Sequence, residues 1–174
     1  MNLSLLERFK IVNEWLKFAE TKHGAIIALN GACVFGLLSI GNVPNGICLY
    51  LKGLTILLFC ISGAASLISF IPTLNKMIHF KTYNNGELNQ IKTEINTLYF
   101  GDLAKLNSSQ LIELVKENDG IQTLNRVDEE IVSQIIQNSR IALVKYRYFS
   151  FAALITFVAI ILGIVNVFFY NACN

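Results

Sequence analysis

The sequence predicts an all-α membrane protein with three transmembrane helices and a small, mainly helical cytoplasmic module between the second and the third. Three apolar stretches, at residues 25–40, 47–71 and 148–170, contain a single charged residue, Lys52. A helix rises about 1.5 Å per residue and the hydrocarbon layer is about 30 Å thick, so about 20 apolar residues span it. The second and third stretches reach that length. The first reaches it if its helix begins near Lys22.

The composition supports the same fold class. Of the 174 residues, 53% are hydrophobic and 15% are charged, with a mean hydropathy of +0.51. Soluble domains have about 45 to 50% apolar and about 25% charged residues. We therefore expect four regions: an amphipathic cytoplasmic helix (1–23), a transmembrane hairpin (24–72), a cytoplasmic sensor module (73–147), and a third transmembrane helix with a short external tail (148–174). A cleaved signal peptide is not expected, because acids interrupt the first 23 residues.

The basic residues predict the orientation in the membrane. Lys and Arg precede the first span and recur throughout 76–147, but none lies in 41–46 or after residue 170. The positive-inside rule therefore places the N-terminus and the sensor module in the cytoplasm and the C-terminus outside. The formal net charge of +2 and the balance of acids and bases in the module do not indicate a nucleic-acid partner.

The first helix should begin after Ser4, because Ser4 and Glu7 have the spacing of a capping box. Its apolar residues recur at spacings of three and four: Leu5, Phe9, Val12, Leu16 and Ala19. The helix is thus amphipathic and should continue into the first span. It either lies on the inner leaflet or packs on the cytoplasmic module. Packing is favoured, because its acids weaken attraction to anionic lipid.

Small and polar residues within the first two spans suggest how these helices pack. Small residues recur every three or four positions and would form a strip on one face of each helix. These strips are Ala28, Ala32 and Gly36 in the first span, and Ser62, Ser66 and Ser69 in the second. Small residues let helix backbones approach closely in a membrane. The strips therefore pack against each other within one subunit, which is the simpler interpretation, or against neighbouring subunits.

Five further residues in or beside the spans allow specific predictions. The amide of Asn30 needs a hydrogen-bonding partner in hydrocarbon, so it should face other helices or water. Lys52 lies close enough to the outer end to extend toward the headgroups. Pro72 should end or kink the second helix. Cys48 and Cys173 both fall at the outer face, but one sequence does not give their separation, so pairing is left open.

The connecting segments give weaker signals. Residues 84–86 are typical of a turn, and residues 95–100 are compatible with a short strand or a helix end. Asn107 or Ser108 should cap a helix that ends at 118–120, and Asp128 should begin another.

The helix from Asp128 is the longest expected element, because no Gly or Pro occurs after it until Gly163. It either forms one rod into the third span or breaks near 146–149. A rod would place Val132, Ile135, Ser139, Ala142 and Tyr146 on one face.

No catalytic or metal-binding motif occurs in the sequence. The sequence contains no GxGxxG, GxxxxGK[ST], HExxH or GxSxG motif, and the two histidines, His23 and His79, stand far apart. We therefore expect a binding module coupled to membrane helices, with no enzymatic activity, cofactor or metal.

Three segments resemble the transmembrane effectors of Pycsar, the bacterial anti-phage system built on a pyrimidine cyclase. These segments are EWLKFAETKHGAIIALNGA (14–32), LYFGDLAKL (98–106) and NSRIALVKYRYF (138–149). The resemblance implies activation by cyclic CMP or cyclic UMP, which then impairs the bacterial inner membrane and arrests or kills the infected cell. It further implies a homo-oligomer in the lipid bilayer that depends on its cognate cyclase without forming a stable complex with it.

The sequence is too short for a β-roll nucleotide domain with a Gly-rich phosphate cassette, so ligand recognition must use something smaller. A cyclic nucleotide needs a cation or amide cluster and an aromatic face. The candidates are Lys105, Arg126, Arg140 and Lys145 for phosphate and Tyr83, Tyr99 and Phe100 for stacking. Two other functions stay open: an ungated channel or holin-like protein, and a membrane-anchored adaptor for a protein partner.

Overall fold

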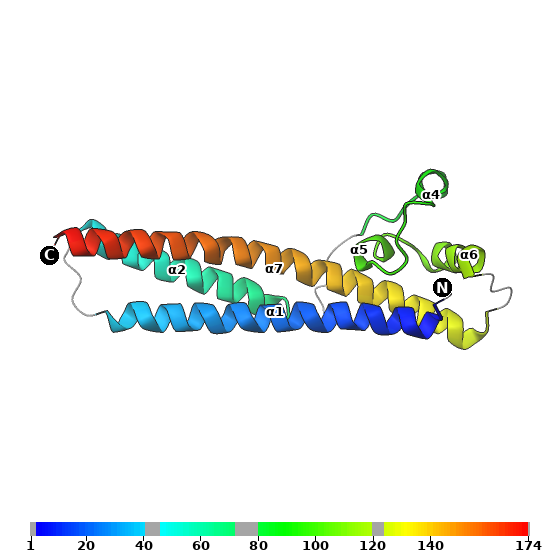
Figure 1. Ribbon diagram of the computed structural model, residues 1–174, viewed down its shortest axis with the longest axis horizontal. Helices are drawn as coiled ribbons and strands as arrows, with labels where there is room; N and C mark the ends of the chain where they lie inside the picture. Colours follow the sequence, from blue (N-terminus) through cyan, green and yellow to red (C-terminus); the bar gives the residue numbers. More distant parts are fainter. Residues whose placement is uncertain (1–2, 41–45, 72–79, 120–123, 174) are drawn as a thin grey trace. The chain divides into compact units, whose positions relative to one another are not determined.

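The computed structural model describes residues 3–40, 46–71, 80–119 and 124–173, and every regular element in these ranges is a helix. The helices are α1 (Leu5–Ser39), α2 (Ile47–Ile68), α4 (Asn85–Ile91), α5 (Phe100–Leu103), α6 (Ser108–Asp119) and α7 (Arg126–Cys173) (Figure 1). Helices α1, α2 and α7 are long and apolar enough to cross a membrane. The predicted fold class is confirmed. The expected role of Pro72 and the side chain of Cys173 fall outside the described part of the chain.

Helix α1 begins where the capping box predicts. The backbone N–H of Ser4 donates to Glu7 Oε2 at 2.8 Å, and the N–H of Glu7 donates to Ser4 Oγ at 3.3 Å. The hydrogen bond from the Ser4 backbone is the main cause that lowers the pKa of Glu7. The helix then continues for 35 residues through the first apolar stretch.

Two predictions for the connecting segments are wrong. The turn expected at 84–86 is the start of α4, because Glu87 Oε2 accepts the backbone N–H of Asn84 at 3.1 Å and completes a capping box. The segment 95–100 is neither a strand nor a helix end. The side chain of Asn96 accepts the N–H of Leu98 at 2.9 Å, which bends the chain, and Phe100 then begins α5.

Both later helices start at a reciprocal cap. Asn107 caps α6, since its Oδ1 accepts the N–H of Gln110 at 2.8 Å. Helix α7 begins at Arg126, two residues before the predicted start. The cap is Asn125, whose Oδ1 accepts the N–H of Asp128 at 2.9 Å. Asp128 is therefore the third residue of the helix. From there α7 runs 48 residues without a break, so the single-rod prediction is confirmed.

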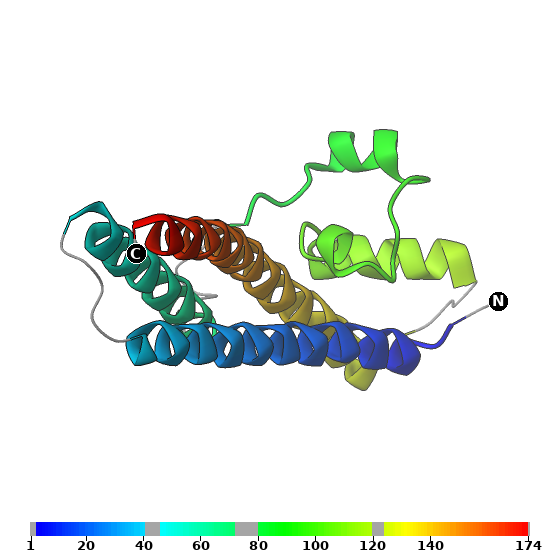
Figure 2. The same ribbon diagram turned by 60° about the vertical axis from the view of Figure 1, so that its left-hand side comes forward.

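The chain divides into two compact units. The first, which we call the helical module, comprises residues 1–19 and 73–146. Its buried apolar core consists of Leu5, Val12, Leu88, Leu103, Leu106, Leu111, Leu114, Val115, Val132, Ile135 and Ile136. In Figure 2 the first part of α1 runs beside the first part of α7, where Asn138 Nδ2 donates to Asn13 Oδ1 at 2.7 Å. The first helix therefore packs on the module, as the favoured interpretation predicted.

The second unit, which we call the membrane unit, comprises residues 20–72 and 147–174. The face of α1 that packs against the other helices contains His23, Ile26 and Asn30, which are buried. The strip Ala28, Ala32 and Gly36 is exposed on this chain, so its expected packing against the second span within one subunit is wrong. The reason is that the amide of Asn30 needs partners in hydrocarbon, whereas small apolar residues tolerate lipid.

We predict that Leu111→Ala lowers the free energy of unfolding of the helical module by about 2 to 5 kcal/mol, because it leaves a cavity in the core. Leu111 is 0% exposed. Hydrogen exchange of the module amides in detergent measures the change. Val127→Ala is the control, since Val127 is 60% exposed, and equal effects of the two substitutions would contradict this description of the core.

Candidate functional site

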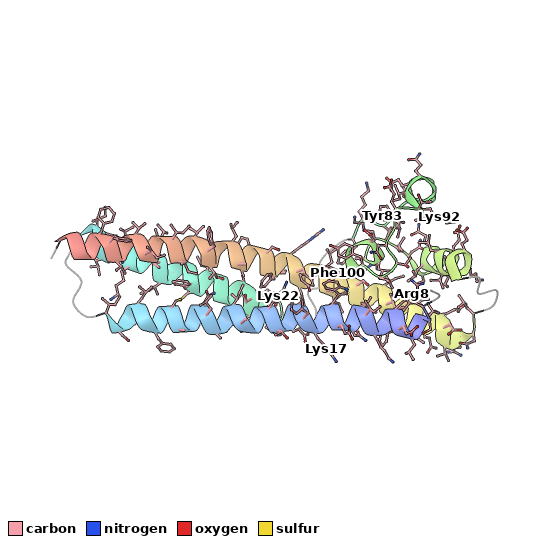
Figure 3. All side chains as sticks on the ribbon, in the orientation of Figure 1. Arg8, Lys17, Lys22, Tyr83, Lys92 and Phe100 are labelled. Carbon is pink, nitrogen blue, oxygen red and sulfur yellow. The ribbon has the colours of Figure 1, made fainter. Side chains whose placement is uncertain are left out.

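A pocket of about 400 Å³ lies in the helical module, lined by Lys81, Thr82, Tyr83, Glu87, Gln90, Ile91 and Lys105. Small-molecule sites occupy about 300 to 1,000 Å³. The segment before α4 carries Tyr83 (Figure 3) and is joined to the turn after α5, because the N–H of Tyr83 donates to the carbonyl oxygen of Lys105 at 3.0 Å. Lys105 Nζ lies 5.5 Å from the centroid of the Tyr83 ring. The pocket thus joins two segments distant in sequence.

The pocket offers the groups that an organic phosphate with a flat base requires. Lys81 and Lys105 supply ammonium groups, Tyr83 supplies an aromatic face, and Gln90 supplies an amide. Lys81 is 87% exposed and Lys81 Nζ lies 3.9 Å from Glu87 Oε1, so this pair is weak and Lys81 is available to an anion. The arrangement suits the binding of an anion that carries a flat ring.

The predicted cation candidates divide into one in the pocket and three elsewhere. Lys105 lines the pocket. Arg140 instead donates from Nε to the carbonyl oxygen of Ala104 and from a terminal nitrogen to that of Leu106, both at 3.1 Å. Arg126 lies on the surface beside Glu130 Oε1 at 3.3 Å, and Lys145 is only 9% exposed. The structure does not bring these three cations to the pocket.

Arg140 therefore has a structural role in the helical module. Ala104 and Leu106 are fully buried, so their carbonyl oxygens need protein partners. The guanidinium also lies 5.6 Å from the centroid of the Phe80 ring. By these contacts α7 holds the turn that presents Lys105.

The predicted stacking residues Tyr99 and Phe100 belong to an aromatic cluster with Trp15 and Tyr146. Phe100 stacks on Tyr146 with ring centroids 4.8 Å apart, and Tyr99 lies 4.8 Å from Phe100. Phe100 is 4% exposed, so its faces are occupied by protein. Burial, with a smaller contribution from Tyr99, raises the pKa of Tyr146. Of the three stacking candidates, only Tyr83 lines the pocket.

Sequence reasoning missed Lys81, Thr82, Glu87 and Gln90. The signal that could have found two of them is the capping box at Asn84, because a helix from Asn85 places Glu87 and Gln90 three residues apart on one face.

Lys92, at the C-terminal end of α4, forms ion pairs with two glutamates of α6. Its Nζ lies 2.6 Å from Glu117 Oε1 and 2.9 Å from Glu113 Oε1. The hydrogen bonds with Glu117 and then Glu113 raise the pKa of Lys92.

A buried polar cluster lies in the membrane unit. Asn30 Nδ2 donates to Ser62 Oγ at 2.9 Å, and Thr156 Oγ1 donates to Asn30 Oδ1 at 3.0 Å. Ser62 Oγ also donates to the carbonyl oxygen of Ala152 at 2.8 Å. The prediction that Asn30 finds a partner on another helix is confirmed. Lys52 Nζ, nearer the helix ends, donates to the carbonyl oxygen of Ile40 at 2.8 Å.

We predict that Arg140→Lys lowers the free energy of unfolding of the helical module by about 1.5 to 3 kcal/mol, because an ammonium group does not reproduce the two-nitrogen contact with buried carbonyls. Chemical denaturation in detergent measures the loss. Arg126→Lys is the matched control, since Arg126 is 92% exposed. A loss no larger than that of the control would show that Arg140 does not hold the turn.

Comparison with known proteins identifies the family. A family model described as the Pycsar effector protein domain matches residues 4–171. The Pycsar effector protein PtPycTM of Propioniciclava tarda is 26% identical over 144 residues, which cover 79% of this chain and 64% of that protein. No solved structure matches significantly. Because the family model covers nearly the whole chain, the protein belongs to the Pycsar transmembrane effectors of bacterial anti-phage defence.

Proposed function

We propose that this protein is a non-enzymatic effector that binds cyclic CMP or cyclic UMP and then impairs the bacterial inner membrane, causing growth arrest or cell death. The observation that carries the proposal is the pocket that joins Lys105 to Tyr83. Lys105 Nζ lies over the Tyr83 ring, 5.5 Å from its centroid. One ligand can therefore bind Lys105 through its phosphate and take the place of the ammonium group over the ring with its base.

The ligand chemistry follows from the groups that line the pocket. Lys105 and Lys81 bind the single negative charge of a cyclic phosphate, and Tyr83 stacks on the base. Gln90 presents both a donor and an acceptor to the base edge. The preference for cytosine or uracil depends on whether the NH2 group or the oxygen of the Gln90 amide faces the base edge.

The response passes through the segment that carries Lys105. Arg140 of α7 donates hydrogen bonds to the carbonyl oxygens of Ala104 and Leu106 in this turn. A ligand that displaces this turn changes the contacts of α7, and α7 is one unbroken helix as far as Cys173. A ligand shifts the protein only by its difference in affinity between two states, so the resting and active positions of this turn must differ in the pocket.

The proposed setting is a homo-oligomer in the inner membrane, with the N-terminus and residues 73–147 in the cytoplasm and the C-terminus in the periplasm. The basic residues before the first span and throughout 76–147 support this orientation. The messenger then reaches the pocket from the cytoplasm, where the cognate cyclase acts without a stable complex.

The proposal is tested with the purified full chain. Titration calorimetry should show binding of cyclic CMP or cyclic UMP in preference to cyclic AMP. Lys105→Ala and Tyr83→Ala should each weaken binding about 10-fold or more, because a hydrogen bond between charged groups is worth about 1.5 to 3 kcal/mol and stacking of a base on an aromatic ring about 1 to 3 kcal/mol. Lys116→Ala, on the exposed face of α6, should leave binding unchanged.

Cells expressing the effector alone should keep their membrane potential and lose it when the preferred nucleotide is supplied. Depolarisation without any nucleotide would favour the ungated channel. Binding that survives Lys105→Ala and Tyr83→Ala would move the site away from this pocket.

We predict the orientation from the same distribution of basic residues. A reporter active only in the periplasm should be active when fused after Asn174 and silent when fused near Gly120. The reverse pattern would place the pocket outside the cytoplasm and out of reach of the messenger.

A further inference from the structure

The buried faces of the three membrane helices are polar along much of their length. These faces comprise His23, Ile26 and Asn30 of α1; Cys48, Thr55, Phe59, Ser62, Ala65 and Ser66 of α2, with Ser69 at its C-terminal cap; and Ala152, Thr156, Ala159 and Asn166 of α7. Most of their spacings are three, four or seven residues, as in coiled coils. Six of them are apolar: Ile26, Cys48, Phe59, Ala65, Ala152 and Ala159. We call the other eight residues the polar seam.

The outer surface of the same unit has the opposite character. Large apolar side chains are exposed there, among them Phe35, Leu57, Phe157 and Phe168, with exposed fractions of 73%, 55%, 61% and 71%. Lipid accepts such a surface. Polar residues inside the membrane commonly face a bundle interior or a water-filled cavity and mark ion pathways.

Helix adhesion explains only part of the seam. The cluster of Asn30, Ser62 and Thr156 is hydrogen-bonded between helices and serves to hold them together. Ser66 Oγ, however, is fully buried and has no hydrogen-bond partner among the described residues. Thr55 and Ser69 donate to carbonyl oxygens of their own helix at 2.8 Å and 2.7 Å. These three hydroxyl groups hold no second helix.

Phe59 interrupts the seam between Thr55 and Ser62, and it is 3% exposed. Two hollows of about 380 Å³ and 340 Å³ share its side chain as a wall. Gly36 and Gly163 line the first hollow, and Gly31 and Gly63 line the second. Both hollows open on the outer apolar surface, because Phe168 lines the first and Phe35 lines the second, and both side chains are exposed. The ring of Phe59 therefore has room on its lipid-facing side. An apolar constriction of this kind closes a pore by excluding water.

The charges of the membrane unit are mostly positive. Lys52 lies toward one end of the unit with its Nζ on the carbonyl oxygen of Ile40. Toward the other end, Lys22 Nζ lies 5.1 Å from the centroid of the Phe149 ring. The sequence of this unit holds one acidic residue, Glu20. Cationic groups at both ends favour anions in a pathway between them.

We propose that the polar seam lines an ion pathway that opens when Phe59 moves out of the bundle. Membrane impairment is then an anion-preferring conductance for small ions, and not a general collapse of the bilayer. The trigger rests on the proposed function, whereas the lining and the constriction rest on the membrane unit alone.

The selectivity test uses the full chain in planar bilayers, with cyclic CMP or cyclic UMP added. The reversal potential in a KCl gradient should show preference for chloride over potassium. Lys52→Glu should lower that permeability ratio by about threefold or more, because it reverses a charge at one mouth. Lys116→Glu, a matched charge reversal in the helical module, should not change it. A ratio unchanged by Lys52→Glu would overturn the anion-preferring pathway.

The constriction test uses Phe59→Ser in liposomes without nucleotide. Chloride efflux should rise about 10-fold or more, since a hydroxyl at this position lets water bridge the seam. Phe157→Ser, the same change on the lipid-facing surface, should leave efflux low. If Phe59→Ser does not fold, Thr156→Val, which keeps the side-chain shape, should lower the nucleotide-induced conductance about threefold or more while binding is retained.

Two outcomes separate this inference from the proposed function. Release of a large dextran as fast as chloride, unaffected by Thr156→Val, would overturn the seam as a pathway even if nucleotide binding is confirmed. Selective efflux through Phe59→Ser in a protein that binds no cyclic nucleotide would support the seam and overturn the proposed trigger.

Discussion

The packing of the membrane unit depends on the buried amide of Asn30. A polar group in hydrocarbon must be satisfied by the protein, and Asn30 achieves this with Ser62 on α2 and Thr156 on α7. This requirement decides which face of α1 turns inward. His23 and Ile26, at helical spacing before Asn30, become buried with it. The opposite strip of small residues is left on the surface, where it can meet lipid or another subunit.

The two units are stabilised in different ways. The helical module has an ordinary apolar core, in which Leu103, Leu106 and Leu111 are fully buried. The membrane unit buries a hydrogen-bonded polar cluster beside a small apolar one, Ile26, Ala65 and Ala152, and its exterior is apolar. In water, burying leucine removes it from solvent and stabilises the fold; in lipid no such gain exists, and hydrogen bonds with close packing hold helices together. Hydrogen bonds between membrane helices are modest in strength, at about 1 kcal/mol each.

Arg140 shows the same principle inside the module. Two buried carbonyl oxygens at the turn after α5 require donors, and the planar guanidinium supplies both. The cation that sequence reasoning assigned to phosphate is therefore occupied by the fold, whereas Lys105, one residue after Ala104, points to a pocket. A cationic side chain near a site can bind a ligand only if contacts within the fold do not already occupy it.

The local features of the fold follow from the sequence. The cap of α1 at Ser4, the lengths of the spans and the continuity of α7 depend on neighbouring residues, on hydrophobic content and on the absence of Gly and Pro, so they were predictable. Tertiary contacts, in contrast, select the helix face that is buried and the charged side chains that lie close together. Tyr83 and Lys105 meet because the N–H of Tyr83 donates to the carbonyl oxygen of Lys105 and Gln110 donates to the carbonyl oxygen of Tyr83. Such choices depend on the partners that distant segments offer, and no local pattern encodes those partners.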